Sequence, residues 1–279
     1  NYRRFFDVND LAGLRMEDPE VFEATHRRVL NLLAAGQVDG LRIDHPDGLR
    51  DPRQYFERLQ QAYAQRLNLP GSADARPGRP RVGRPPVGRP LYLVIEKITA
   101  SHEEVPRDWA IHGTTGYRFA MVAGGVLIDT NAEAALERLW REFTDLRKRF
   151  DQIAYEGKRL VMRQALSAEL TRLTSVLARI AQADRHTRDY TFNTLRGALA
   201  EVVAGMPVYR SYIVAQASEQ DRRHLDRALA HARRRWQSPD ASVFDFIRRV
   251  LLPEALPPGV PPAAASEFAA RFQQFCAPV

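Results

Sequence analysis

The stretch VDGLRIDHPDGLR, residues 38–50, decides how this chain begins to fold. Its first half, residues 38–44, has the pattern of a short β-strand. Side chains alternate along a strand, so Leu41 and Ile43 would face one way while Arg42 and Asp44 face the other. The turn residues at 45–48 then end the strand and leave Asp44 at its carboxyl end.

A second strand is predicted at residues 91–96, LYLVIE, where a nearly unbroken apolar run is typical of a parallel strand buried on both faces. A helix that starts at Asp51-Pro52 lies between the two, with an apolar stripe that we assign to the core. An earlier helix is predicted from Asp18-Pro19 to Gly36. A strand–helix–strand crossover makes two parallel strands. It would therefore bring the ends of the strands, Asp44 and Glu96, close together.

Two carboxyl groups about 5–5.5 Å apart are what a retaining glycosidase needs. Neighbouring strands lie about 4.8 Å apart, so adjacent strand ends can set that spacing. Arg42, two residues before Asp44, favours an ionised carboxylate that can act as a nucleophile. Glu96 follows an apolar run, which favours the protonated form that a general acid requires. The alternative is that both are ordinary strand-end residues, with Arg42 and Asp44 a structural ion pair.

Composition indicates a globular protein: 279 residues, 44% hydrophobic and 27% charged. The net charge of +7 could indicate a nucleic-acid partner, but +4 of it lies in residues 70–90, rich in Pro, Gly and Arg, which we expect to be a disordered loop. No apolar run approaches the roughly 18 residues that span a membrane. One cysteine, Cys276, fits a reducing compartment. We therefore expect a cytoplasmic protein with no nucleic-acid and no membrane partner.

The second half of the chain reads as amphipathic helices, so we expect an α/β, helix-rich fold in two parts. Residues 1–129 would hold the strands and residues 130–279 an all-helical subdomain. Helices are predicted at 131–149, 152–181, 187–204, 219–236, 242–251 and 264–275.

Two short motifs resemble signature regions of the α-amylase superfamily, glycoside hydrolase family 13. Gly40-Leu41-Arg42-Ile43-Asp44-His45 resembles the region that presents the nucleophile, and Val94-Ile95-Glu96-Lys97-Ile98 the region that presents the acid/base. More narrowly, the chain resembles the maltooligosyltrehalose synthases. The stretches that carry this narrower likeness are 1–15, 38–49, 94–98, 112–119, 167–203 and 207–213.

This resemblance implies part of a (β/α)8 TIM barrel and an intramolecular transglucosylation. The reducing-end α-1,4 linkage of a maltooligosaccharide, or of an α-1,4-glucan, would become an α,α-1,1 trehalose linkage through a double displacement. Asp44 would attack and Glu96 would shuttle the proton. The superfamily's third carboxylate, in a later His-Asp pair, has no counterpart in the sequence. We therefore expect an internal segment of a longer enzyme, inactive without the missing parts.

The same resemblance suggests four substrate-binding residues. His45 lies beside the nucleophile and Lys97 directly after the acid, where each could bond a sugar hydroxyl. His112 and Tyr117 flank a Gly-Thr-Thr-Gly loop that could line the site of the reducing-end glucose. We expect no cofactor, and the histidine spacing suggests no metal site.

Other functions stay open. An α-glucan hydrolase or a 4-α-glucanotransferase could use the same pair of carboxyl groups. A non-catalytic helical interaction module, with the strand–helix–strand unit as a remnant, is a different class. Non-reducing products would separate the mutase from the hydrolase.

Overall fold

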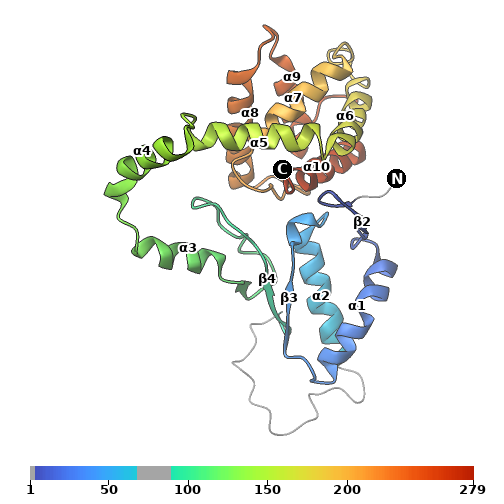
Figure 1. Cartoon of the computed structure of the whole chain (residues 1–279). Coiled ribbons are helices and arrows are strands. Elements are labelled where there is room, and N and C mark those ends of the chain that lie inside the picture. The colour runs from blue at the N-terminus through green and yellow to red at the C-terminus, as the bar shows by residue number, and fades with distance from the viewer. Residues whose placement is uncertain (1–3, 68–88) are drawn as a thin grey trace. The chain divides into compact units, whose positions relative to one another are not determined.

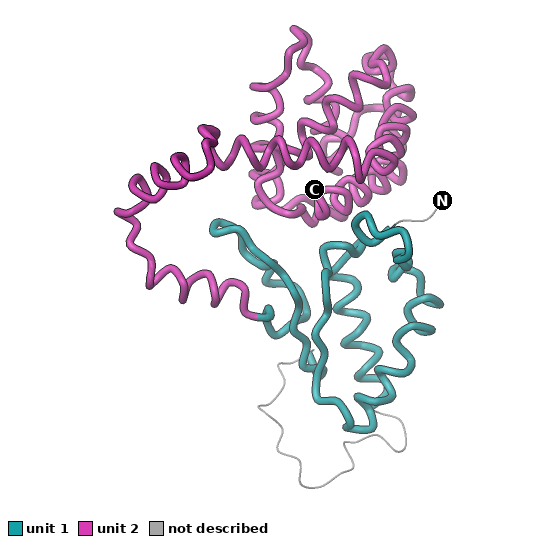
Figure 2. The backbone as a smooth tube through the Cα atoms, viewed as in Figure 1, with its two compact units in different colours: residues 1–115 teal, residues 116–279 magenta. Residues whose placement is uncertain are grey.

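The computed structural model describes residues 4–67 and 89–279; the predicted 70–90 loop lies, apart from its last two residues, outside the described residues. The chain divides into two compact units, residues 1–115 and 116–279 (Figure 2). The first is α/β and the second is helical, which gives the helix-rich α/β class that the sequence predicts.

The first unit opens with a hairpin and a helix. Strands β1 (Arg4–Phe5) and β2 (Val8–Ala12) pair antiparallel. Helix α1 (Pro19–Ala34) begins where the sequence predicts, because the Asp18 side chain accepts a hydrogen bond from the Glu20 backbone N–H. Gly36, with φ of 67°, stands just beyond the helix and confirms the predicted stop.

The sheet of the first unit is parallel and has the strand order β3-β4-β5. Strand β3 (Gly40–Ile43) pairs in register with β4 (Tyr92–Ile95), Gly40 opposite Tyr92 and Ile43 opposite Ile95. Helix α2 (Pro52–Leu67) connects them, so the predicted strand–helix–strand unit is confirmed (Figure 1). Strand β5 (Gly113–Thr114) is too short to leave a pattern in the sequence.

Helices cover one face of this sheet. Helices α1 and α2 pack against each other. The Gln60 side chain of α2 bonds both the N–H and the C=O of Leu91, just before β4. Leu93 and Ile95 are fully buried, whereas Tyr92 is 56% exposed and Val94 half-buried. The prediction that this strand is buried on both faces is therefore wrong within this unit, and its second face is open.

The second unit consists of helices and short 3₁₀ turns. Its first part holds α3 (Tyr117–Val126), a 3₁₀ turn (Thr130–Ala132) and α4 (Glu133–Thr144). The rest is α5 (Phe150–Arg163), α6 (Ser167–Ala181), α7 (Phe192–Ala204), α8 (Glu219–Arg235), α9 (Ser242–Leu251), a 3₁₀ turn (Pro253–Ala255) and α10 (Pro262–Cys276). Helix α7 packs against α5, α6, α8 and α9, so it is the centre of this core.

The helix predictions fail at particular places. The predicted 152–181 helix is two, α5 and α6, broken at residues 164–166, where no Gly or Pro marks the break. The predicted 187–204 helix begins only at Phe192, after a Thr191 cap. Helix α3 was not predicted. Because it groups with the helices that follow, the units divide at Thr115 and Gly116 instead of at residue 129.

Within the described ranges, no single helix is long and apolar enough to span a membrane. Helices α3 and α4, with the 3₁₀ turn joined to α4, reach that length and composition only together, and they are bent by 81°.

Candidate active site at the carboxyl ends of β3 and β4

Asp44 and Glu96 are the first residues after β3 and β4, and they stand opposite each other. The strands are in register up to Ile43 and Ile95, and the Glu96 backbone N–H donates to the Ile43 carbonyl oxygen at 2.8 Å. Residues paired across parallel strands project to the same face. Asp44 and Glu96 therefore project from neighbouring strands to the open face of the sheet, as the sequence predicts.

Arg42 projects to this face as well and forms an ion pair with Asp44. Its Nη1 lies 2.6 Å from Asp44 Oδ1, with side chains 48% and 65% exposed. A solvated pair of this kind contributes about 0–1 kcal/mol to folding. The guanidinium is better placed to orient the carboxylate than to stabilise the strand.

Glu96 is half-buried and bonded to the turn that follows β3. Its Oε2 accepts a hydrogen bond from the His45 backbone N–H at 3.0 Å. This bond joins the end of β4 to the residue directly after Asp44. The sequence predicted an apolar setting for Glu96, but the structure provides a polar contact instead.

His45 has a left-handed backbone, with φ of 42° and ψ of 55°, and a half-buried ring. The rings of Phe5 and Phe6 lie 5.5 and 4.9 Å from the imidazole, centre to centre. Gly48 leaves room for it, because a Cβ there would lie 2.8 Å from His45 Cδ2. The structure thus keeps His45 beside the two carboxyl groups, with its ring among aromatic neighbours that the sequence did not suggest.

Lys97 is placed differently from the prediction. Its side chain is fully buried, and its ammonium contacts Asp47 Oδ2 at 3.1 Å and Glu103 Oε1 at 2.9 Å. An ammonium enclosed by two carboxylates cannot reach a sugar hydroxyl. The direct substrate contact expected for Lys97 is therefore corrected to a supporting role.

Asp47 and Glu103 are residues that sequence reasoning missed. Asp47 reads as part of a turn and Glu103 as part of a loop, and nothing in the linear pattern shows that both are buried. The only signal was Lys97 itself, a charged residue that continues an apolar run.

His112 and Tyr117 are not brought to the carboxyl groups by the first unit. The His112 backbone N–H donates to the Leu93 carbonyl oxygen, and its Nδ1 accepts from the Leu93 N–H. Leu93 precedes Glu96 by three residues, so His112 lies roughly 10 Å from it along the strand. Burial, and then the Arg89 charge, lower the pKa of His112. Tyr117 is the first residue of α3, in the second unit, and is 43% exposed.

In the part of the chain that the structure describes, no group of three or more His, Cys, Asp or Glu residues could hold a metal ion. The chemistry available at this face is that of carboxyl groups, a guanidinium and an imidazole.

Comparison with known proteins connects this geometry to a family. A Mycobacterium tuberculosis (strain H37Rv) protein provisionally named maltooligosyl trehalose synthase is 33% identical over 183 residues. The solved maltooligosyltrehalose synthase of Arthrobacter ramosus is 32% identical, with a TM-score of 0.73 over 100% of this chain. The chain is a relative of the maltooligosyltrehalose synthases.

The match to maltooligosyltrehalose synthases has a limited extent. The chain spans about a fifth of the length of the curated relative (21%) and 30% of the solved Arthrobacter chain. A Sulfolobus tokodaii structure, 22% identical with a TM-score of 0.63, shares the fold over 99% of this chain and 29% of its own. No family model matches the sequence.

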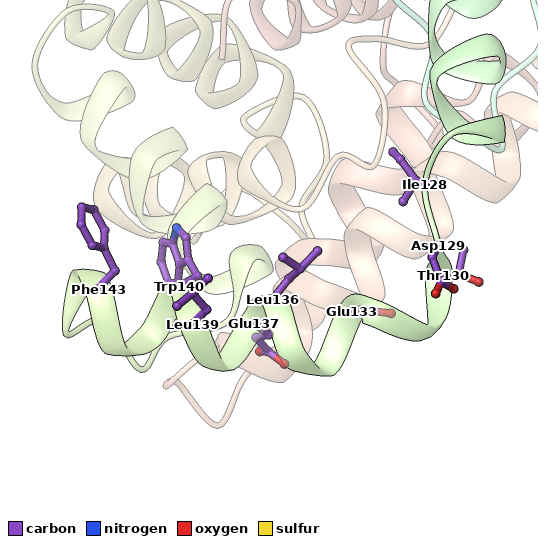
Figure 3. A pocket seen from close by; sticks show the side chains of 9 residues that line it. All are labelled: Ile128, Asp129, Thr130, Glu133, Leu136, Glu137, Leu139, Trp140 and Phe143. Atoms are coloured by element: carbon purple, nitrogen blue, oxygen red, sulfur yellow. The ribbon is translucent and has the colours of Figure 1, made fainter.

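A second feature, an apolar groove, lies in the second unit, mainly on α4. It is an open groove of about 830 Å³. Leu136, Trp140 and Phe143, spaced as neighbours on one helix face, line it together with Leu139 and Ile128 (Figure 3). Its lining is mostly apolar, without the pair of carboxyl groups that the first unit presents.

Proposed function

We propose that this chain supplies the nucleophile and the acid/base of a retaining enzyme that isomerises the reducing end of maltooligosaccharides. The reaction turns the last α-1,4 linkage into an α,α-1,1 linkage by intramolecular transglucosylation. The observation that carries the proposal is the placement of Asp44 and Glu96 on neighbouring strand ends of one open sheet face. The kinship with the synthases supports the choice of substrate.

In the first step, an Asp44 carboxylate oxygen attacks the anomeric carbon of the penultimate glucose. The bond from that carbon to the leaving oxygen breaks, and Glu96 gives its proton to this oxygen. A glycosyl ester on Asp44 and a free glucose result. Arg42, 2.6 Å from Asp44, keeps the attacking carboxylate oriented.

In the second step, the freed glucose turns while it stays bound. Glu96 takes the proton from its anomeric hydroxyl, and that oxygen attacks the glycosyl ester and releases Asp44. Two inversions restore the α configuration, and Glu96 is protonated again. Water must be excluded between the steps, because it would otherwise hydrolyse the ester.

We expect the 279-residue chain alone to show little turnover on maltopentaose. The family's third carboxylate has no counterpart in this sequence, and the relatives are about three times longer by the covered shares. Robust formation of trehalose-ended product by this chain alone would contradict this expectation.

The first test compares Asp44→Asn with Glu96→Gln in the full-length protein. With maltopentaose, Glu96→Gln should lower kcat about 10²- to 10⁴-fold, the usual contribution of a general acid/base. Asp44→Asn should lose at least as much. Asp108→Asn, an exposed carboxyl paired with Arg53 in the same unit, is the matched control and should keep activity.

An activated donor separates the two roles. From a maltooligosyl fluoride the leaving group is a fluoride ion, which departs without a proton. Glu96→Gln should therefore still form the glycosyl ester and accumulate it, and mass spectrometry should detect the ester on the peptide that holds Asp44. Asp44→Asn should form none. Ester formation by Asp44→Asn would sink the nucleophile assignment.

Product analysis separates the mutase from its alternatives. Non-reducing products of unchanged length indicate the proposed isomerisation. New reducing ends indicate an α-glucan hydrolase, and chains of altered length indicate a 4-α-glucanotransferase.

A further inference from the structure

A buried ion triad lies directly behind the candidate active site. It consists of Lys97, Asp47 and Glu103, whose side chains are 0%, 8% and 3% exposed. The Lys97 ammonium has three N–H donors, and three acceptors lie within reach: Asp47 Oδ2 at 3.1 Å, Glu103 Oε1 at 2.9 Å and the Ile98 carbonyl oxygen at 3.3 Å.

The triad joins the segments that follow β3 and β4. Asp47 lies in the 3₁₀ turn Pro46–Gly48, three residues after Asp44. Lys97 is the residue after Glu96. Glu103 is itself held in the loop after β4, because its Oε2 accepts a hydrogen bond from the Ala100 N–H. The ammonium thus ties the turn that carries the nucleophile to the strand end that carries the acid/base.

This tie bears on Glu96 through His45. The His45 N–H donates to Glu96 Oε2 from a left-handed backbone, a conformation that costs a non-glycine residue free energy. Asp47, two residues further on, is held by Lys97. Without the contact between Lys97 and Asp47, the turn could relax, and the His45 N–H would move away from the Glu96 carboxyl group.

We propose that Lys97, Asp47 and Glu103 are positioning residues that set the orientation of the Glu96 carboxyl group through the turn at 45–48. The proposal rests on the function proposed above for Glu96. It also explains why a charged triad is buried there at all, since three well-packed apolar residues would fill the same space without a desolvation cost.

The test uses Asp47→Asn in the full-length protein. This substitution keeps the shape of the side chain and leaves Lys97 in a one-to-one pair with Glu103, so the formal charge of the buried group changes from −1 to zero. Two donors are compared: a maltooligosaccharide, whose leaving group needs the Glu96 proton, and the corresponding fluoride, whose leaving group does not. Formation of the glycosyl ester is followed for both.

We expect Asp47→Asn to slow ester formation from the maltooligosaccharide by about 10²-fold, the effect of a displacement near 1 Å, and to leave the fluoride reaction nearly unchanged. A merely structural role would reduce both rates equally, and that result would overturn the proposal. If Asp47→Asn does not fold, Glu103→Gln carries the same test with the same outcomes.

Glu104→Gln is the matched control, since this neighbour of Glu103 is 67% exposed and pairs only loosely with Arg107, at 3.5 Å. It should leave both rates unchanged. Glu96→Gln is measured in parallel: if it fails to show the selective loss, the proposed function fails and the triad is not the cause.

Discussion

At the scale of single residues, His45 shows how the site stores strain. A left-handed backbone at a residue other than glycine costs about 1–3 kcal/mol. The bond from its N–H to Glu96 and the contacts of its ring with Phe5 and Phe6 offset this cost. Strain that persists next to two carboxyl groups is typical of a site whose geometry is held in advance.

His26 leads to a prediction about pH. Its Nδ1 lies 2.9 Å from the Phe22 carbonyl oxygen and its Nε2 2.7 Å from the Tyr55 hydroxyl. Burial lowers the pKa of His26, against smaller raising effects of Phe22 and Glu23. Burial also raises the pKa of Tyr55 to about 12, so this hydroxyl stays a donor and suits a neutral imidazole.

The direction in which stability changes with pH follows from the lowered pKa of His26. Below the unfolded value near 6.5, the unfolded chain binds a proton that the folded chain does not, so stability falls as pH falls from 6.5 toward the folded pKa. We expect urea unfolding at pH 7.5 and 5.5 to show this loss, and His26→Gln to reduce it. His102→Gln, at an exposed position, should leave the loss unchanged. An identical loss in His26→Gln would contradict the assignment.

At the scale of elements, the pairing of β3 with β4 depends on Gly40. A Cβ at this position would lie 2.7 Å from both the carbonyl oxygen and the Cδ1 of Tyr92. Since a backbone oxygen cannot move without breaking the pairing, we expect Gly40→Ala to destabilise the first unit by about 1–3 kcal/mol. Urea unfolding followed by circular dichroism measures this.

Gly157→Ala is the control for the general effect of replacing glycine by alanine. Nothing lies within 4 Å of a Cβ at this position in α5, so alanine should stabilise its helix by about 0.5–1 kcal/mol. Opposite signs at the two glycines are expected. A neutral Gly40→Ala would mean that β3 and β4 can move apart at no cost, and the spacing of Asp44 and Glu96 would then be poorly defined.

The sequence predicts well those elements that have a capping residue or a clear periodicity of apolar side chains. Asp18 caps α1, and the alternation across Leu41–Asp44 fixes the faces of β3, so both the strand and the opposition of Asp44 to Glu96 follow from it. Strand β5 has only two residues. Helix α3 follows Gly116, whose φ is 94°, and contains Gly124 and Gly125, which disfavour helix, so local signals oppose it.

At the scale of the whole molecule, each of the two compact units has its own core. In the second unit, α7 is buried among the helices around it. The amphipathic stripes in the sequence predict that these helices pack together, but they do not show which helix packs against which. The buried triad of the first unit could not be predicted, because three charges from separate segments become neighbours only after the chain folds. Burial of charge depends on tertiary contacts, whereas apolar periodicity is local.

The side chains of α3 and α4 contrast with both cores. Apolar groups in these helices and between them are largely exposed: Phe119 76%, Val126 81%, Leu127 88%, Leu139 61% and Phe143 89%. Exposed apolar surface of this kind drives association in water.

We expect the 279-residue chain to self-associate in a concentration-dependent manner, and Leu139→Glu/Phe143→Glu to shift it toward monomer. Both side chains line the α4 groove, and two carboxylates there would replace apolar surface with groups that repel a second copy. Sedimentation velocity over a range of concentrations measures the change. Arg138→Glu/Arg147→Glu, which alters exposed charges in and just after α4 and leaves the groove apolar, is the control. If the control dissociates the chain as well as the groove variant does, net charge governs the association and the apolar face does not.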